Sequence, residues 1–224
     1  MRVNIYGVPA NVLVRWILRF TFSKENVLWV DAACGNGNFT REIGFIPEKG
    51  IGVDIVEVTP ALPQNFIFSK KTISDWIGEN TGRKFDVISS FEFVEHVEKK
   101  DANCFITNVK KMARLVIFST PSGFLKQDAE TDKSLENNPW LWHRCGFSPD
   151  EFEKLGFVVF ILKNAHHRPK GNEKSFDKLI VYWGENKTSM RSVAWKVTIM
   201  SFLYNLIPIH LYRTIRDTFF LPFV

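Results

Sequence analysis

Short apolar runs alternate with polar, helix-capable stretches over residues 27–119, and this alternation limits the fold more than any other feature of the chain. The runs are VLWVD (27–31), GIGVDI (50–55), NFIF (65–68), FDVISS (85–90) and RLVIFS (114–119). Strands that are joined by helices lie parallel and are covered on both faces. The pattern therefore predicts an α/β fold built on a parallel sheet.

A long polar segment precedes two further apolar runs. Residues 122–146 are irregular and longer than an ordinary connection, which is typical of a functional loop or lid. We expect a helix to begin at Pro149, with Ser148 as its cap and Gly156 as its end. The runs FVVFIL (157–162) and KLIVYW (178–183) then predict two more strands.

Length and composition fit one domain with short appendages. The chain has 224 residues, of which 45% are hydrophobic and 24% charged. We divide it into an N-terminal helical segment (1–23), a main domain (24–184) and an amphipathic tail rich in aromatic and basic residues (185–224). Cys34, Cys104 and Cys145 lack the spacing of a disulfide framework or a thiolate zinc site. These features predict a cytoplasmic location.

The positive charge is concentrated near the C-terminus. Residues 166–224 contain nine Lys or Arg and four Asp or Glu, so they carry the entire net charge of +5. This asymmetry indicates either an anionic partner, such as a membrane surface or a phosphorylated substrate, or only a solvated basic face. The uncharged run 197–212 is shorter than the roughly 20 residues of a spanning helix, so a transmembrane anchor is not expected.

The segment VLWVDAACGNGNFT carries the first ligand-binding signal. It places Asp31 at the end of a strand, Gly35 and Gly37 in a tight turn, and a helix start after them. Small residues let backbone amides approach a ligand closely at such a helix N-terminus. Asp54 closes the next strand, 23 residues beyond Asp31, a spacing suited to ribose hydroxyls. Thr40 stands where the nicotinamide-dehydrogenase fingerprint needs glycine, which disfavours that class.

With these motifs in order, residues 24–184 resemble the class I S-adenosylmethionine (SAM)-dependent methyltransferases, near the type 11 and type 23 members that act on small molecules or glycans. The resemblance implies a Rossmann-like, doubly wound, mostly parallel seven-stranded sheet with an antiparallel last strand, followed by the helical tail. It also implies SAM as the cofactor. The residues implied to bind it are Asp31, Ala33, Cys34, Gly35, Gly37, Asp54, Ile55, Thr72, Ile73 and Ser90.

Within this set, the resemblance places Gly35 and Gly37 beside the methionine and ribose part of the cofactor, and Asp31 near its amino group. Two positions depart from the family pattern. Ala33 replaces a frequent glycine, which is tolerable if its backbone keeps φ negative. Thr72 stands where many members place an acid beside adenine, so that contact falls to Thr72, Ile73 or Asp75.

The string FEFVEHVE places Glu92, Glu95 and His96 just past the fourth predicted strand, and His143 precedes the capped helix. We expect His96 or His143 to be the general base, oriented by Glu95 or Glu92. All four side chains also form an N/O ligand set for a divalent cation, a second cofactor candidate. The pattern is similar to that of small-RNA 3′-terminal 2′-O-methyltransferases and of ubiquinone-pathway O-methyltransferases. In the alternative reading, the Glu binds backbone amides and the His only packs beside the cofactor.

These observations predict SAM-dependent O-methylation of a small hydroxyl acceptor, including acceptors linked to a lipid or a sugar. The alternatives are a metal-dependent RNA 2′-O-methyltransferase and a non-catalytic SAM-binding scaffold. The neutral body of the chain disfavours nucleic acid as a partner. The tail 185–224 either caps the domain, lies on a membrane surface or forms a dimer contact. Trp140 and Trp142 either wall the acceptor pocket or pack in the core.

Overall fold

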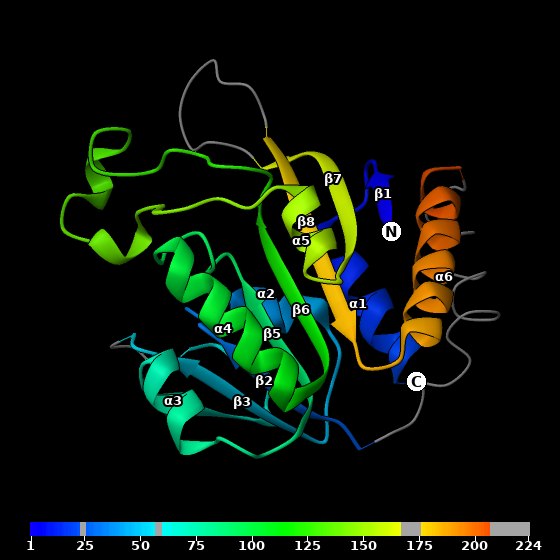
Figure 1. The fold of residues 1–224 in the computed structure, drawn as a ribbon, viewed down its shortest axis with the longest axis horizontal. Coiled ribbons are helices and arrows are strands. Elements are labelled where there is room, and N and C mark those ends of the chain that lie inside the picture. The colour runs from blue at the N-terminus through cyan, green and yellow to red at the C-terminus, as the bar shows by residue number, and fades with distance from the viewer. Residues whose placement is uncertain (23–25, 57–59, 167–175, 207–224) are drawn as a thin grey trace.

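The computed structural model describes residues 1–22, 26–56, 60–166 and 176–206, which form a single eight-stranded sheet with helices on both faces (Figure 1). The strand order is β1-β7-β8-β6-β5-β2-β3-β4. The strands are β1 (Arg2–Ile5), β2 (Leu28–Ala32), β3 (Lys49–Asp54), β4 (Phe66–Lys70), β5 (Phe85–Phe91), β6 (Ala113–Pro121), β7 (Val158–His166) and β8 (Phe176–Gly184). All seven predicted strands are present, and β8 runs antiparallel to both of its neighbours, β6 and β7. The predicted α/β fold is thus confirmed.

The eighth strand, β1, was not indicated by the sequence patterns. It pairs in parallel with β7, from Arg2 opposite Val159 to Ile5 opposite Leu162. Within the segment 1–23, residues 2–5 are therefore extended, and only α1 (Ala10–Thr21) is helical. Ile5 is the one buried side chain of β1, so this edge strand carries almost no hydrophobic pattern of its own.

The helices form two layers. One face of the sheet is covered by α1, α2 (Asn38–Ile43) and α6 (Lys187–Leu206), and the other by α3 (Ile73–Glu79), α4 (Lys99–Met112) and α5 (Pro149–Lys154). Two short 3-10 helices, η1 (Lys133–Leu135) and η2 (Pro139–Leu141), lie in the loop between β6 and α5. None of the described helices is both long and apolar enough to cross a bilayer.

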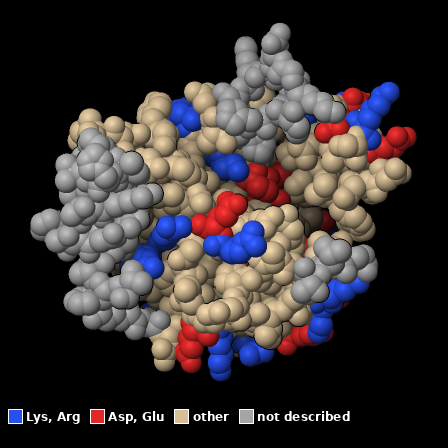
Figure 2. All heavy atoms as spheres, turned by 180° about the vertical axis from the view of Figure 1, so that it is seen from behind, with Lys and Arg blue, Asp and Glu red and all other residues tan. Residues whose placement is uncertain are grey.

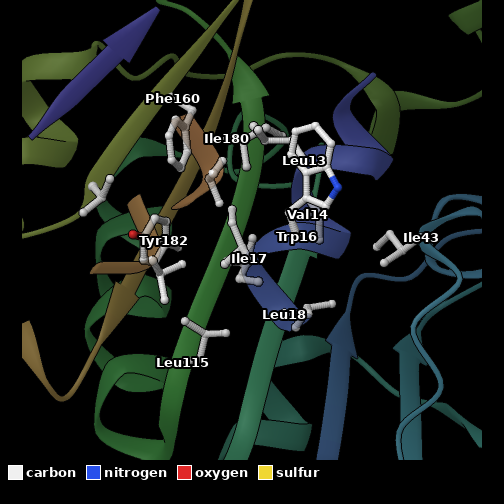
Figure 3. Packing of buried hydrophobic residues seen from close by; sticks show 14 of the residues in the cluster. Leu13, Val14, Trp16, Ile17, Leu18, Ile43, Leu115, Phe160, Ile180 and Tyr182 are labelled. Atoms are coloured by element: carbon white, nitrogen blue, oxygen red, sulfur yellow. The ribbon is translucent and has the colours of Figure 1, made fainter. Parts of the chain in front are cut away.

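Alternation along the strands divides the core between these layers. On β6, Leu115 and Ile117 face the cluster built with α1 and α6, whereas Val116 and Phe118 face the cluster built with α3, α4 and α5. Figure 3 shows the residues of α1, including Trp16, lying over the strands of the first cluster. Each fully buried side chain of this size stabilises the fold by about 1.5–3 kcal/mol.

The helix predicted after the long loop is confirmed. Ser148 caps α5 by accepting a hydrogen bond from the backbone N–H of Glu151, and the Glu151 carboxylate accepts one from the N–H of Ser148 in return. Gly156 follows with a φ of +85°, the conformation that favours glycine at a helix end. The tail is described only as far as Leu206, so the predicted break at Pro208 lies outside the described residues.

Candidate active site

A cleft of about 1180 Å³ opens at the carboxyl ends of β2, β3 and β5. From β2 the chain proceeds outward to β3 and β4, and β5 then starts the other half of the sheet on the opposite side of β2. Ligands bind at such switch points in doubly wound sheets. The predicted site residues that line the cleft are Asp31, Ala33, Cys34, Gly35, Asp54, Ile55, Thr72, Ile73, Glu92 and His96.

The glycine turn shapes one wall of this cleft. Gly37 has a φ of +75°, and a Cβ there would lie 3.0 Å from the backbone of Ala61 and Leu62. Gly35 has a φ of +54°, but no heavy atom lies within 4 Å of the place a Cβ would take. Gly37 is therefore required by close packing of the backbone. Gly35 leaves open space that a bound ligand can occupy, so this loop fits a cofactor.

Ala33 differs from the expectation of a negative φ. Its φ is +59°, in the left-handed region where a Cβ is strained and glycine is favoured. The position therefore keeps the backbone shape that a glycine would give, although the residue is alanine.

The carboxylate of Asp54 joins the end of β3 to the glycine turn. One oxygen accepts a hydrogen bond from the N–H of Gly35 at 2.7 Å. The other accepts from the N–H groups of Ile55 at 2.7 Å and Val56 at 3.1 Å. An ionised carboxylate offers about four acceptor positions, so capacity is left for a hydroxyl donor from a ligand. This arrangement fits the ribose-binding role that the family resemblance implies.

Asp31 lies buried at the bottom of the cleft. Its carboxylate accepts hydrogen bonds from the hydroxyl of Ser89 at 2.8 Å and from that of Thr40, and Trp29 in turn donates to Ser89. Burial raises the pKa of the Asp31 carboxyl to about 7. A cationic ligand group beside it would stabilise the ionised form. The position therefore fits the amino group of SAM.

Thr72 and Ile73 line the far end of the cleft at the start of α3. The Thr72 hydroxyl accepts from the backbone N–H of Asp75 and donates to its carboxylate at 2.7 Å. Asp75 is engaged in this cap and does not line the cleft. Of the three candidates for the adenine contact, Thr72 and Ile73 are thus the two in position.

Glu92 follows β5 with a φ of +53°. Its carboxylate accepts from the hydroxyl of Ser119 at 2.7 Å and pairs with Lys178 at 3.4 Å. Its backbone N–H donates to the carbonyl of Ser119. These contacts tie the chain beyond β5 to β6 and β8, so Glu92 holds the shape of the cleft wall as well as lining it.

Glu95, His96 and His143 lie together beside the cleft. One ligand-type atom from each lies within 4.8 Å of the others, and the two imidazole rings have centroids 4.8 Å apart. The Nδ1 atoms face backbone carbonyls, that of Trp142 at 3.3 Å for His96 and that of Leu125 at 2.6 Å for His143. Assigning the protons to these nitrogens leaves the Nε2 atoms as the acceptors or ligands of the two rings.

The charge states of this cluster follow from burial. Burial, and then the neighbouring charge of Glu92, raises the pKa of Glu95 well above its ordinary value. Burial, followed by the neighbouring His143, lowers the pKa of His96 to about 4. Burial also lowers the pKa of His143. In the described part of the chain, neither carboxylate oxygen of Glu95 has a hydrogen-bond partner. Burial therefore favours the uncharged form of the Glu95 carboxyl, and its oxygens have room for one more polar or cationic partner.

Four predicted residues lie behind the cleft wall. Gly37, Ser90, Glu95 and His143 are not among its lining residues, and Ser90 and Glu95 are almost fully buried. Trp140 lines the cleft as one of the two proposed pocket tryptophans. Trp142 does not, because its ring nitrogen donates to the carbonyl of Leu135 within the loop.

Sequence patterns missed most of the apolar wall. Phe39 and Phe91 pack with ring centroids 4.6 Å apart. Phe91 ends β5 and Phe39 lies in the first turn of α2, so their places at a strand end and a helix start were the available signal. The other missed lining residues are Asn36, Thr40, Val56, Lys71, Ser74, Ile77, Phe93, Val97, Asp101, Cys104, Phe105, Asn108, Asn138 and Leu141.

Comparison with known proteins assigns the chain to a family of sequences. A family model described as "Methyltransferase domain" (Methyltransf_23) matches residues 9–156, whereas no curated protein sequence gives a match. The solved N-methyltransferase NodS from Bradyrhizobium japonicum, in complex with S-adenosyl-L-homocysteine, has 15% identity and a TM-score of 0.48 over 80% of this chain and 90% of that one.

Two further solved structures match the chain at low identity. A SAM-dependent methyltransferase from Archaeoglobus fulgidus has 19% identity and a TM-score of 0.47 over 77% of this chain and 94% of that one. The small RNA methyltransferase HEN1 has 16% identity and a TM-score of 0.48 over 80% of this chain and 26% of that one. Since the family model covers more than half of the chain, the protein belongs to the class I SAM-dependent methyltransferases, within the Methyltransferase domain family.

Proposed function

We propose that the protein transfers the methyl group of SAM to a hydroxyl oxygen of a small, largely apolar acceptor, including acceptors linked to a lipid or a sugar. The observation that carries this proposal is the position of His96, a neutral imidazole at the cleft surface beside an aromatic wall. A hydroxyl must lose its proton as its oxygen takes the methyl group, and an imidazole within reach can accept that proton.

The charges of the cleft favour an acceptor without phosphate groups. Its titratable lining residues include the acids Asp54, Glu92 and Asp101, whereas its cation, Lys71, is already paired with Glu79. Phe93, Phe105 and Trp140 also line it. Acidic groups repel anions, and aromatic groups bury apolar surface. A neutral or cationic acceptor with an apolar body therefore fits better than a polyanion.

Each residue then has a defined task. Bound SAM would supply the electrophilic methyl group, held by Asp31, the glycine turn and Asp54. The aromatic wall excludes water and orients the acceptor. His96 accepts the hydroxyl proton at Nε2, because its Nδ1 faces the carbonyl of Trp142. His143 packs against the His96 ring and holds its orientation.

The test is SAM turnover with a panel of neutral hydroxyl acceptors, measured as S-adenosylhomocysteine release. His96→Ala should lower kcat by about 10²–10⁴-fold and leave SAM affinity within about threefold of the parent. His143→Ala should likewise lower turnover far more than cofactor binding. Equal losses of both would indicate that these histidines only support the structure. Methylation confined to amine or thiol acceptors would contradict the proposal.

A second candidate is a metal-assisted reaction, favoured by the grouping of Glu95, His96 and His143. A buried carboxylate and two imidazoles, with one ligand-type atom of each within 4.8 Å of the others, fit a divalent cation, which would lower the pKa of an acceptor hydroxyl. Glu92 lies outside this group of three. Activity lost with chelator and restored by Mn²⁺, and a Glu95→Gln variant that no longer responds to the metal, would support this candidate. An unchanged rate in chelator would remove it.

A metal site of this kind would make RNA a candidate acceptor. Figure 2 shows the molecule from behind the view of Figure 1. Over the coloured part of that face, Lys and Arg are interspersed with Asp and Glu, and no broad basic groove is seen there. RNA-binding surfaces instead gather positive charge along the backbone path. We therefore expect no methylation of RNA 3′ ends, and RNA turnover comparable with that of small hydroxyl acceptors would reverse this preference.

A further inference from the structure

Helix α6 is apolar on two opposite faces, but only one of them is packed. Its inner face buries Met190, Val193, Ala194, Val197 and Met200 against α1, β1 and β8. A helix that is apolar all round is normally buried all round. In Figure 1, α6 stands at the edge of the molecule beside α1, with one side turned away from the sheet.

The outer face of α6 presents a continuous apolar stripe to solvent. Trp195, Ile199, Phe202 and Leu206 are 64%, 44%, 65% and 62% exposed. Ile199, Phe202 and Leu206 follow Trp195 by four, seven and eleven residues. At about 100° per residue, these spacings place all four side chains within one narrow stripe, roughly 16 Å long. Scattered apolar residues are common on protein surfaces, whereas a contiguous stripe of this kind marks an interaction site.

An exposed tyrosine lies beside the stripe. Asn205 of α6 donates a hydrogen bond to the carbonyl of Tyr6 at 2.8 Å, which brings the chain after β1 next to the end of α6. Tyr6 is itself 61% exposed. The surface formed by Tyr6, Trp195, Ile199, Phe202 and Leu206 is called the α6 outer face below. Trp and Tyr favour the boundary between lipid headgroups and acyl chains.

Charge around the α6 outer face has one sign. Arg191 lies on the stripe one turn before Trp195, and Lys187 and Lys196 flank it on either side by the same helical geometry. Neither α6 nor α1, the helix against which it packs, contains a single Asp or Glu. An anionic surface complements this arrangement.

A second copy of the chain fits less well. A two-fold contact would place the same stripe, with its cations, against itself. Like charges would then be brought together in an apolar contact, which is unfavourable. The sequence after Leu206 contains Arg213, Arg216, several aromatic residues and one acid, Asp217.

We propose that the α6 outer face docks the protein onto the surface of an anionic lipid bilayer, with α6 lying parallel to the membrane plane. The apolar side chains enter the headgroup boundary, and the flanking cations contact acidic headgroups. The helix lies on the bilayer without crossing it, in agreement with the lack of a spanning helix among the described residues. This inference does not depend on the identity of the methyl acceptor.

Vesicle co-sedimentation of the full chain tests whether the α6 outer face binds an anionic bilayer. Binding to vesicles of phosphatidylcholine with 30% phosphatidylglycerol should exceed binding to pure phosphatidylcholine by more than tenfold and should fall as salt is raised. Phe202→Asp should weaken binding at least tenfold, because a charge replaces an inserted ring. The double variant Arg191→Gln, Lys196→Gln should weaken it about 25-fold, at roughly fivefold for each cation near the surface.

Ile67→Asp is the matched control. Ile67 is 67% exposed but lies on β4, at the opposite edge of the sheet from α6. This variant should bind vesicles like the parent, and circular dichroism should show that all variants are folded. Equal binding of parent and Phe202→Asp, or absence of binding by the parent, would overturn the proposal. A parent dimer that Phe202→Asp converts to a monomer, without vesicle binding, would overturn it in favour of a second copy.

Discussion

Ala33 keeps a backbone conformation that suits glycine better than alanine. Its φ of +59° costs an L-residue roughly 1 kcal/mol, because the Cβ approaches the following carbonyl oxygen. We expect Ala33→Gly to raise the free energy of unfolding by about 0.5–1 kcal/mol, since glycine removes this strain. Urea denaturation measures the change.

Ala32→Gly is the neighbouring control for this prediction. Ala32 is fully buried in β2, where glycine loses packing and gains freedom in the unfolded chain. That variant should be less stable than the parent. A destabilised Ala33→Gly protein would show that the Ala33 side chain contributes packing worth more than its backbone strain.

Asp31 should make stability depend on pH in an unusual direction. Its pKa is about 7 in the folded chain because the carboxyl is buried, against about 3.9 for an unfolded aspartate. The folded state therefore holds this proton more tightly. The contribution of Asp31 to stability is fully present below pH 4 and is lost as pH rises through 7.

Asp31→Asn isolates this contribution. The variant lacks the titrating group, so the free energy of unfolding of the variant minus that of the parent should increase between pH 4.5 and pH 8. Glu95 has a raised pKa in both proteins, so its effect cancels in the difference. Chemical denaturation at several pH values provides the measurement, and a difference that does not change with pH would contradict the assignment.

For single residues, the sequence predicted which side chains belong to the site better than it predicted how they are placed. Asp31, Gly35 and Asp54 could be predicted, because their spacing follows directly from a strand, a tight turn and the next strand. The burial of Glu95 and the position of His143 behind the cleft wall could not be predicted. Both depend on how the loop 122–147 folds back, as in the hydrogen bonds from Arg144 and Cys145 to the carbonyl of Glu95.

Helix α5 shows how fully a local signal can determine an element. The Ser148 cap, the first-turn proline and the terminal glycine were predicted from the sequence, whereas the return bond to Glu151 that completes the capping box was not. Ser148→Ala should lower the free energy of unfolding by about 1 kcal/mol, because the N–H of Glu151 loses its acceptor. Thermal denaturation should show this as a lower Tm.

Ser192→Ala serves as the control for the cap. Ser192 is exposed in the interior of α6, where alanine is a better helix former, so its stability should change by less than about 0.5 kcal/mol. Similar losses for both variants would mean that the Ser148 cap contributes nothing specific.

An element whose residues show only a weak hydrophobic pattern could not be predicted from the sequence. β1 has four residues and one buried side chain, and it exists because β7 offers an edge for pairing. Such a strand depends on tertiary context and has no local period. The central strands could be predicted because both of their faces are buried, which gives near-continuous apolar runs.

For the whole molecule, cofactor binding should appear as added stability. Excess SAM at about 100 times its Kd should stabilise the parent by about 2.7 kcal/mol, seen as a rise in Tm. Gly35→Arg should abolish this rise, because the new side chain occupies the open space beside the glycine turn.

Gly78→Arg introduces the same change at a position with equally open space, exposed on α3 and outside the cleft lining. The increment in Tm with SAM should survive in that protein. Because each variant is compared with itself in the absence of SAM, backbone strain at Gly35 does not enter the comparison. An increment that is equal in both variants would contradict the cofactor position.

The pairing of β1 with β7 and the packing of α1 on α6 also affect how the chain is made. The ribosome releases residues 2–21 early, but β7, the strand that pairs with β1, begins at residue 158, and α6, on which α1 packs, begins at residue 187. The apolar face of α1, including Trp16, therefore stays without the part of its cover that α6 provides after the central strands have been made. We expect nascent chains to bind holdase chaperones through this segment until α6 has emerged.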